Sequence, residues 1–521
     1  MELVKREIRT TVCKAEKNVQ ITLDKDMNVP DSRPDVEKLI QSKGEIRLDE
    51  IEVMNERIRV KGVLYYKGLY HTAEAGPMFS SLTGILELEE YINADGITIN
   101  DSVKVTAELD DLNVMLIHSR KLGIRALITL SAEVSETKRV EGAIGTEGEP
   151  VEQLFSDVNL TQLAFQKRDI CRIKGGMTLA QSKPNIRELI WDNAALRNPE
   201  VRMMEGRIQI RGEVHIFYLY SGEEEHVPIQ HIEWEMPFTV EITCPECRDD
   251  MVGHVQVSLG SYQLEVKPDE DGEERNLIFE ATLNLDMKGY EEEKVSLLED
   301  VYSTEKEIDV IFTPFEYENL IVKNNAKTKV HRRISWKEMK GKILQLIHVD
   351  GCVKVDEVEC REDGIYVEGV ILADLLMITD DDYQPLYGAT QILPFSHLVE
   401  VRNVGEKDKF KLSASLETIH GTMPDSDEVD LKAIVSLDVI AFSERVGKTI
   451  TQMMEHPYEY EQMKQIPGIA VYIAEKEEPV WNVAKAYLST VEEIRKMNQL
   501  DSTMLKSGQR IMITKKVREV L

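Results

Sequence analysis

The chain has 521 residues, of which 30% are charged, and its formal net charge at pH 7 is −31. A chain of this length is too long for one hydrophobic core, which predicts several domains. From residue 469 on there are nine Lys and Arg against seven Asp and Glu, so the preceding residues carry −33. This acidic body disfavours nucleic acid and anionic membranes as partners, because both would repel it.

Three features of the sequence bear on the cellular compartment of the protein. Residues 1–7 contain no apolar run typical of a signal peptide. The best apolar run, Gly369–Thr379, is interrupted by Asp374, so no segment is expected to span a bilayer. Six cysteines in so long a chain do not indicate a disulfide framework. We therefore expect a cytosolic protein.

Three similar segments follow one another along the chain. Each contains a strand with alternating apolar residues that ends at a glycine, after which a second strand begins. These segments are Arg57–Gly62, Arg207–Gly212 and Gly364–Gly369. In every copy a second landmark lies 26 positions after the glycine, and the three landmarks are Leu88, Phe238 and Phe395. Equal spacing in three copies predicts three tandem domains of one fold.

Each unit is expected to be β-sandwich-like with little helix. Two further strands end each unit, and Asp-Gly turns such as Asp271-Gly272 join strands. A short helix with proline in its first turn is predicted at Arg33–Ile40 and at Lys183–Ile190, and Trp336–Leu346 takes its place in the third unit. The predicted domains are residues 1–140, 155–310 and 311–444, followed by a linker over residues 445–468.

The second unit contains the one C-x-x-C pair, Cys244 and Cys247, with His254 nearby. A structural zinc site usually has four ligands, commonly from a second pair, and Cys352 and Cys360 belong to another unit. No βαβ pattern surrounds the pair to support a redox role. Loop cysteines are therefore the favoured interpretation, and a zinc site is the alternative.

Two other motifs resemble functional loops only in part. Gly447–Thr449 imitates the end of a phosphate-binding loop that precedes a helix, but the position of the required earlier glycine is Phe442, which favours a linker. Asp380–Asp382 lacks the alternating ligands and glycine of a calcium loop, and it is predicted to be a hairpin turn. No motif fixes a nucleophile, a base and an oxyanion donor together, so we predict no catalytic residues, no cofactor and no enzyme.

The last fifty residues are predicted to form a small βααβ module over residues 469–515. Strands are expected near Val471–Ile473 and over residues 510–514, and two short helices lie between them. With Trp481, Asn498 and Gly508-Gln509, this segment resembles the LysM domain, a module best known for binding N-acetylglucosamine polymers. Trp481 and Val483 fall on the apolar face of the first helix, which predicts that they belong to the core.

Three acidic β-units ahead of a LysM-like module resemble the clostridial SipL-type spore coat morphogenetic proteins, whose repeated unit is called the SPOCS domain. The resemblance implies a mother-cell protein that assembles at the forespore surface. It also implies binding to the basement-layer ATPase of the coat, stage IV sporulation protein A, with other coat proteins as further partners. The alternative from another class is a wall protein that binds peptidoglycan or N-acetylglucosamine polymers, and a zinc-dependent regulator using Cys244 and Cys247 is a third hypothesis.

One loop departs from the LysM pattern. The family usually has Gly-Asp-Thr-Leu before the tryptophan, and this chain has Glu477–Val480 there. Glutamate replaces the glycine, and proline replaces the threonine together with its hydroxyl and amide donors. The loop therefore favours a protein partner over a sugar. The predicted partner-binding residues lie on this loop and on the loop that faces it: Glu477, Glu478, Pro479, Val480, Leu500, Asp501, Ser502 and Thr503.

Overall fold

The computed structural model describes residues 1–73, 78–223, 229–336, 342–401, 405 and 408–515, and most of them lie in long antiparallel strands. The strands of the first unit are β1 (Glu2–Asn28), β2 (Val36–Met54), β3 (Arg57–Thr72), β4 (Phe79–Asn93), β5 (Ser102–His118) and β6 (Lys121–Glu147). Those of the second unit are β7 (Glu152–Thr178), β8 (Ile186–Met204), β9 (Arg207–Gly222), β10 (Gln230–Thr243), β11 (Val252–Pro268) and β12 (Glu274–Tyr302). The third unit has β13 (Lys306–Ser335), β14 (Ile343–Arg361), β15 (Gly364–Thr379), β16 (Leu386–Glu400), β17 (Lys409–Asp425) and β18 (Glu428–Pro457).

Each unit is a sandwich of two three-stranded sheets. In the first unit the strand orders are β1-β6-β5 and β2-β3-β4, and the other two units repeat this order. Alternating residues of the central strands point into the sandwich, so Ile58 and Leu64 of one sheet share a buried cluster with Ile128 of the other. The predicted mainly β fold with three sandwich-like repeats is confirmed.

The 26-residue spacing has a direct structural reason. Each glycine of the repeat lies opposite its landmark in the ladder between the third and fourth strands of its unit, so that Gly212 pairs with Phe238 and Gly369 with Phe395. A Cβ atom on either glycine would lie 2.9 Å from Cζ of its phenylalanine. The missing side chain therefore makes room for the ring across the strand pair.

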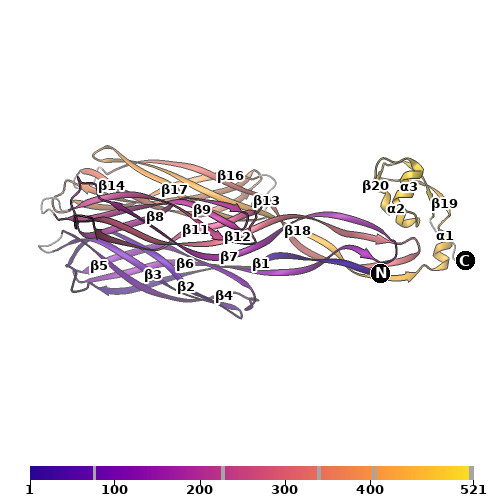
Figure 1. Cartoon of the computed structure of the whole chain (residues 1–521), viewed down its shortest axis with the longest axis horizontal. Coiled ribbons are helices and arrows are strands. Elements are labelled where there is room, and N and C mark those ends of the chain that lie inside the picture. Colours follow the sequence, from indigo (N-terminus) through magenta and orange to yellow (C-terminus); the bar gives the residue numbers. More distant parts are fainter. Residues whose placement is uncertain (74–77, 224–228, 337–341, 402–404, 406–407, 516–521) are drawn as a thin grey trace.

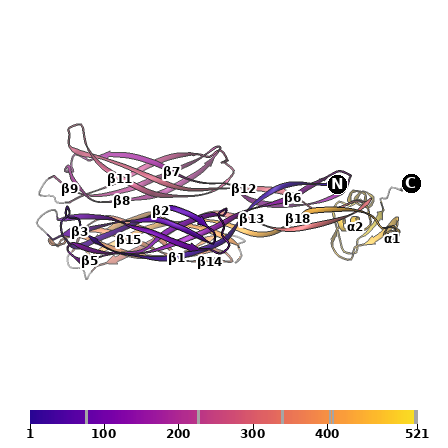
Figure 2. The same cartoon turned by 90° about the horizontal axis from the view of Figure 1, so that it is seen from below.

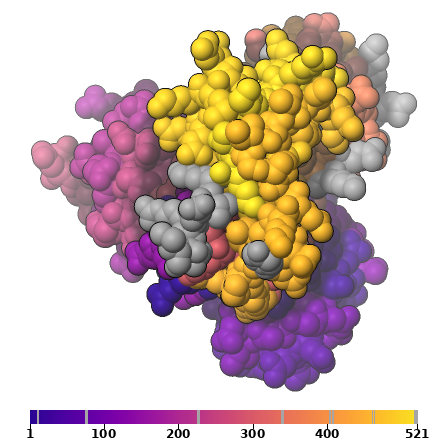
Figure 3. All heavy atoms as spheres, turned by 90° about the vertical axis from the view of Figure 1, so that its right-hand side faces the viewer, coloured from indigo at the N-terminus to yellow at the C-terminus, as the bar shows by residue number. Residues whose placement is uncertain are grey.

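The three sandwiches surround a common axis, and each appears as a separate lobe from the end of the molecule (Figure 3). From the side, the second unit is seen apart from the other two (Figure 2). Residues at equivalent positions of the three units meet in one buried cluster on this axis. Leu69, Leu219 and Leu376 form one such set. Since apolar side chains from all three units are buried together there, the three sandwiches form one packed body.

A polar set occupies the axis beside this cluster. Its members are Lys43, Asn193 and Asp350, which stand at equivalent positions of β2, β8 and β14. Asp350 accepts hydrogen bonds from Lys43 at 2.9 Å, from Asn193 at 2.5 Å and from Arg197 at 2.5 Å. Burial raises the pKa of Asp350, but the positive charges of Lys43 and Arg197 outweigh it, and this pKa lies well below its ordinary value.

The first and last strands of every unit extend beyond the sandwiches and together form a stalk (Figure 1). In these extensions β1 pairs with β6, β7 with β12 and β13 with β18. The stalk is packed around its own apolar residues, among them the equivalent trio Ala143, Leu298 and Ile450, each fully buried. Strands therefore cross each boundary predicted at 140, 155, 311 and 444.

Two predictions of local structure are wrong. No helix follows Pro34 or Pro184, because β2 and β8 begin two residues later and pair at once with β3 and β9. In the third unit residues 337–341 lie outside the described residues, and β14 follows them. The predicted linker is also wrong over residues 445–457, which belong to β18 and pair with β13.

After β18 the chain enters α1 (Tyr460–Gln465) and then a small module at the end of the stalk (Figure 1). The module consists of β19 (Ile469–Ile473), β20 (Glu478–Pro479), α2 (Val480–Ala486), α3 (Val491–Asn498), β21 (Met504–Leu505) and β22 (Arg510–Thr514). Since β19 pairs with β22 around the two helices, the predicted βααβ arrangement is confirmed. No helix in the described part of the chain is long and apolar enough to cross a membrane.

Candidate functional site

The two predicted loops of the C-terminal module lie against one another. Strand β20 pairs with β21, which joins Glu478 to Leu505 and Pro479 to Met504. Where this ladder ends, the Val480 amide donates to the Thr503 carbonyl at 2.8 Å. The loop before α2 and the loop after α3 therefore form one continuous edge of the module.

The eight predicted partner-binding residues differ in their access to solvent. Glu477, Asp501, Ser502 and Thr503 are exposed, and Glu478, Pro479 and Leu500 are half-buried. The exception is Val480, which is fully buried in the core of the module. Its side chain offers no surface to a partner, so the structure removes it from the predicted set.

A hydrogen bond fixes the carboxylate of Glu478. The Tyr472 hydroxyl donates to Glu478 Oε1 at 2.6 Å, and this bond, with a smaller effect of burial, raises the pKa of Tyr472 to about 12. Pro479 has no amide hydrogen, so this position offers no backbone donor. The loop thus presents a free carboxylate at Glu477 beside a carboxylate that is already hydrogen-bonded.

Trp481 belongs to the core of the module, as predicted, and it also contacts the stalk. Its side chain is buried with Val483, which confirms the core assignment of both residues. The indole Nε1 donates to Asp300 of β12 at 2.8 Å, and the ring packs edge-on against Tyr302 at a centroid distance of 4.8 Å. Sequence reasoning did not identify Asp300 and Tyr302, because nothing in the sequence indicates which strand end the module contacts.

The cysteine pair lies in a buried turn after β10. The Cys244 amide donates to the Gly206 carbonyl, and the Gly206 amide donates to the Cys247 carbonyl. In the first unit the same turn holds Ala94 and Ile97, which are equally buried. Burial raises the pKa of both thiols, which disfavours the thiolate that a metal requires. The cysteines therefore fill a position that an aliphatic residue fills elsewhere in the chain.

The two remaining motifs are structural. Gly447–Thr449 lies inside β18, and the fully buried Thr449 hydroxyl accepts a hydrogen bond from the Ala143 amide at 2.9 Å. No helix follows this segment directly, so it does not have the geometry of a phosphate-binding loop. Asp380–Asp382 forms the turn between β15 and β16, as predicted.

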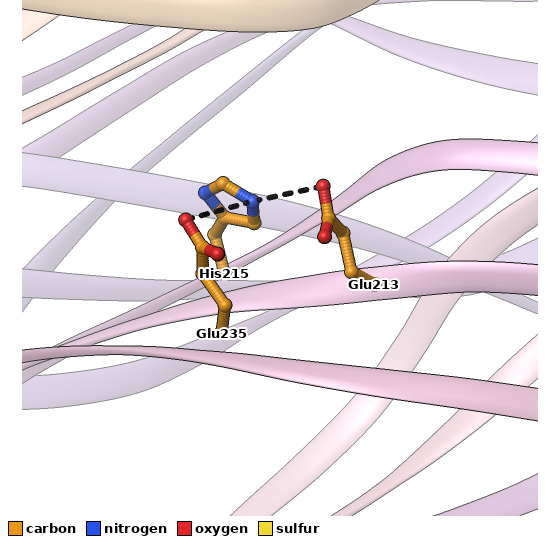
Figure 4. Close-up of side chains that lie close together, drawn as sticks. All are labelled: Glu213, His215 and Glu235. Atoms are coloured by element: carbon orange, nitrogen blue, oxygen red, sulfur yellow. Dashed lines mark ion pairs between the residues drawn. The ribbon is translucent and has the colours of Figure 1, made fainter.

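One trio of potential metal ligands occurs among the described residues, on the second unit (Figure 4). His215 Nε2 lies 3.3 Å from Glu213 Oε1 and 3.7 Å from Glu235 Oε1. The imidazole is one-third exposed and Glu235 two-thirds exposed, so water reaches the trio. The distances are those of a surface ion-pair cluster, and no further donor completes a coordination shell among the described residues.

Comparison with known protein families agrees with the geometry. The SipL, SPOCS domain family matches residues 35–117, 185–267 and 342–424, and the LysM domain family matches residues 472–514. Both are non-catalytic domain families, and this combination fits a coat-associated protein of sporulation, while LysM domains suggest binding to peptidoglycan or other glycans. No curated protein and no solved structure gives a significant match to the chain.

Proposed function

Because this chain belongs to the proteins that combine three SipL SPOCS domains with a C-terminal LysM domain, we propose that it is a non-enzymatic adaptor of spore coat assembly. It would tether the coat to the forespore surface from the mother-cell side. The LysM domain would bind the basement-layer ATPase, stage IV sporulation protein A, and the SPOCS domains would offer further contacts to coat proteins. Several modest contacts on one rigid body raise the overall affinity without any single tight site.

The observation that carries this proposal is the structure of the loop before α2, where the LysM family usually has Gly-Asp-Thr-Leu. Glu478 is hydrogen-bonded to Tyr472, and Pro479 is engaged in the β20–β21 ladder. Trp481 is buried against the stalk. A neutral sugar would meet the exposed Glu477 carboxylate and no backbone donor at Pro479, which disfavours a glycan and leaves a polar edge suited to a protein with complementary charge.

A capture experiment with the full chain tests the proposal, since stalk residues form part of the LysM core. The immobilised protein is expected to retain the purified ATPase and to leave peptidoglycan in the supernatant. Sedimentation with peptidoglycan and no capture of the ATPase would instead support the wall-binding alternative.

The Glu477→Lys variant locates the interface. Glu477 is exposed, so its reversal changes the charge of the loop without disturbing the core. We expect weaker capture of the ATPase, by about a factor of ten, since close like charges at an interface are strongly unfavourable. Glu492→Lys makes the same charge change at an exposed residue of α3 and is the matched control. Equal capture by both variants would place the interface elsewhere on the molecule.

A further inference from the structure

We propose that the stalk end of the second unit, where β12 ends, is a built docking site for the LysM domain of the same chain. In this proposal Asp300 and Tyr302 are positioning residues. They fix the orientation of the LysM domain on the stalk, and they cover Trp481 so that ligands cannot reach it. The consequence for partner capture rests on the proposed function, whereas the docking itself stands on the contacts between the two parts of the chain.

The polar part of the dock converges on one carboxylate. Asp300 accepts hydrogen bonds from Trp481 Nε1 at 2.8 Å and from Lys485 Nζ at 2.6 and 2.8 Å. Trp481 and Lys485 lie on α2, one helical turn apart, and both therefore face the stalk. Charge-assisted hydrogen bonds of this kind are stronger than neutral ones and set a direction as well as an affinity.

The apolar part of the dock makes the stalk a portion of the LysM core. Tyr302 is 3% exposed and belongs to the same buried cluster as Trp481, while Leu154 of the facing strand packs against that cluster. The Tyr302 hydroxyl donates to the buried Ser489 carbonyl at 2.8 Å. The stalk therefore supplies both a ring that covers the indole and a donor that satisfies a LysM backbone carbonyl.

Comparison of the three domains shows that this set of residues is particular to the second one. The positions equivalent to Asp300 are Gly145 and Gln452, each paired across the stalk ladder as Asp300 is. The positions equivalent to Tyr302 are Glu147 and Met454, both exposed. The Asp300 carboxylate and the Tyr302 phenol occur together only at the end of β12 among the three equivalent strand ends, and that end contacts the LysM domain.

The connecting segment is held at the same place. The Tyr458 hydroxyl donates to the Ser303 carbonyl at 2.8 Å, directly after Tyr302. Farther on, Lys515 Nζ donates to the Met463 carbonyl of α1 at 2.6 Å, which joins the end of β22 to the connection. The segment that connects β18 to the module is thus held by a hydrogen bond near each of its ends. These two contacts keep the module close to Asp300.

Lys485→Glu tests the dock with little effect on the LysM fold, since the Lys485 side chain is 40% exposed and its ammonium group contacts Asp300 of the stalk. The change removes two charge-assisted hydrogen bonds and places two carboxylates together, so we expect the undocked population to rise at least about tenfold. Lys496→Glu makes the same change at an exposed residue of α3 and is the matched control. Tyr302→Phe removes a single hydroxyl, and we expect a rise of about fivefold.

Hydrogen exchange and small-angle X-ray scattering of the full chain measure the outcome without any partner. In Lys485→Glu the amides of α2 that adjoin the stalk should exchange faster, the β19–β22 ladder should stay protected, and the scattering should show a wider spread of long distances. Exchange and scattering equal to those of Lys496→Glu would overturn the docking proposal and leave the proposed function standing. Loss of protection in β19–β22 as well would also overturn it, because the contact would then serve LysM folding and not its orientation.

Discussion

Replacement of Asp350 by alanine tests the polar set on the axis of the three SPOCS domains. Asp350 belongs to β14 of the third domain, and its hydrogen-bond partners belong to the first domain (Lys43) and to the second (Asn193 and Arg197). The side chains of Asp350 and Arg197 are only 9% and 8% exposed. The substitution leaves the Arg197 guanidinium buried without its carboxylate, whose 2.5 Å contact with Arg197 joins two domains.

The expected cost follows from the burial of this pair. Removing one partner of a buried ion pair costs about 3–5 kcal/mol, because the remaining charge stays desolvated. An exposed pair such as Arg47–Asp49, with side chains 48% and 43% exposed, is worth about 0–1 kcal/mol. Asp350→Ala should therefore lower the free energy of unfolding by several kcal/mol, and Asp49→Ala should lower it by about 1 kcal/mol at most.

Urea unfolding followed by circular dichroism measures both variants and the Lys43→Ala/Asp350→Ala pair. The double variant should lose less stability than the sum of the two single losses, since Lys43 and Asp350 share one contact. The pKa of Asp350 lies below its ordinary value, so its stabilisation is present above about pH 4 and is lost as the pH falls further. A loss of unfolding free energy for Asp350→Ala no larger than that for Asp49→Ala would refute the assignment of Asp350 as a buried link between domains.

Three further outcomes are expected. Burial, with nearby lysines, lowers the pKa of His254 from 6.5 to about 4, so between these two pH values the unfolded chain binds one more proton than the folded chain. The free energy of unfolding should therefore fall by up to about 3 kcal/mol on acidification through this range. Urea unfolding of His254→Gln at pH 7 and pH 4.5 should lack that fall. Cys244→Ala should cost about 1 kcal/mol or less in thermal unfolding, because Ala94 fills the same turn in the first domain, and a zinc-dependent stabilisation lost in this variant would revive the metal hypothesis. Trp481→Ala should destabilise the LysM domain by about 3–5 kcal/mol, because the indole is part of its core. Amide hydrogen exchange should become faster in β19–β22, while the SPOCS ladders stay protected. Unchanged protection of β19–β22 would contradict the place of Trp481 in the core.

The sequence allowed the repeated strands to be predicted, because each repeat carries its own local signals. Alternation of apolar residues marks the strands, and the Gly212–Phe238 spacing reflects a direct pair in the ladder. The prediction of a helix after Pro34 and Pro184 failed for a physical reason. Proline at a first helical turn and proline just before an edge strand look alike locally, and pairing with the neighbouring strand decides between them.

The stalk and the LysM dock could not be predicted from local patterns. Strand period tells which residues share a face, but it does not tell which surface covers that face, so the meeting of Ala143, Leu298 and Ile450 is visible only in three dimensions. The same holds for the contact of Trp481 with Asp300, which are 181 positions apart. The expectation that the loop before α2 lies beside the loop after α3 agrees with the Pro479–Met504 pair and the Val480–Thr503 hydrogen bond, because the βααβ pattern itself brings those loops together. The role of these loops in partner binding stays a prediction.

The three SPOCS domains differ at equivalent positions that make contacts between domains. Three identical domains around an axis would present three identical ends, with no reason for a single LysM domain to choose one. Here Lys43, Asn193 and Asp350 stand at one equivalent position but differ in chemistry, and their hydrogen bonds link the three domains. Asp300 and Tyr302 then make the second end different from the others. The result is a rod with one oriented module at its tip, and this geometry is compatible with the proposed role of an adaptor.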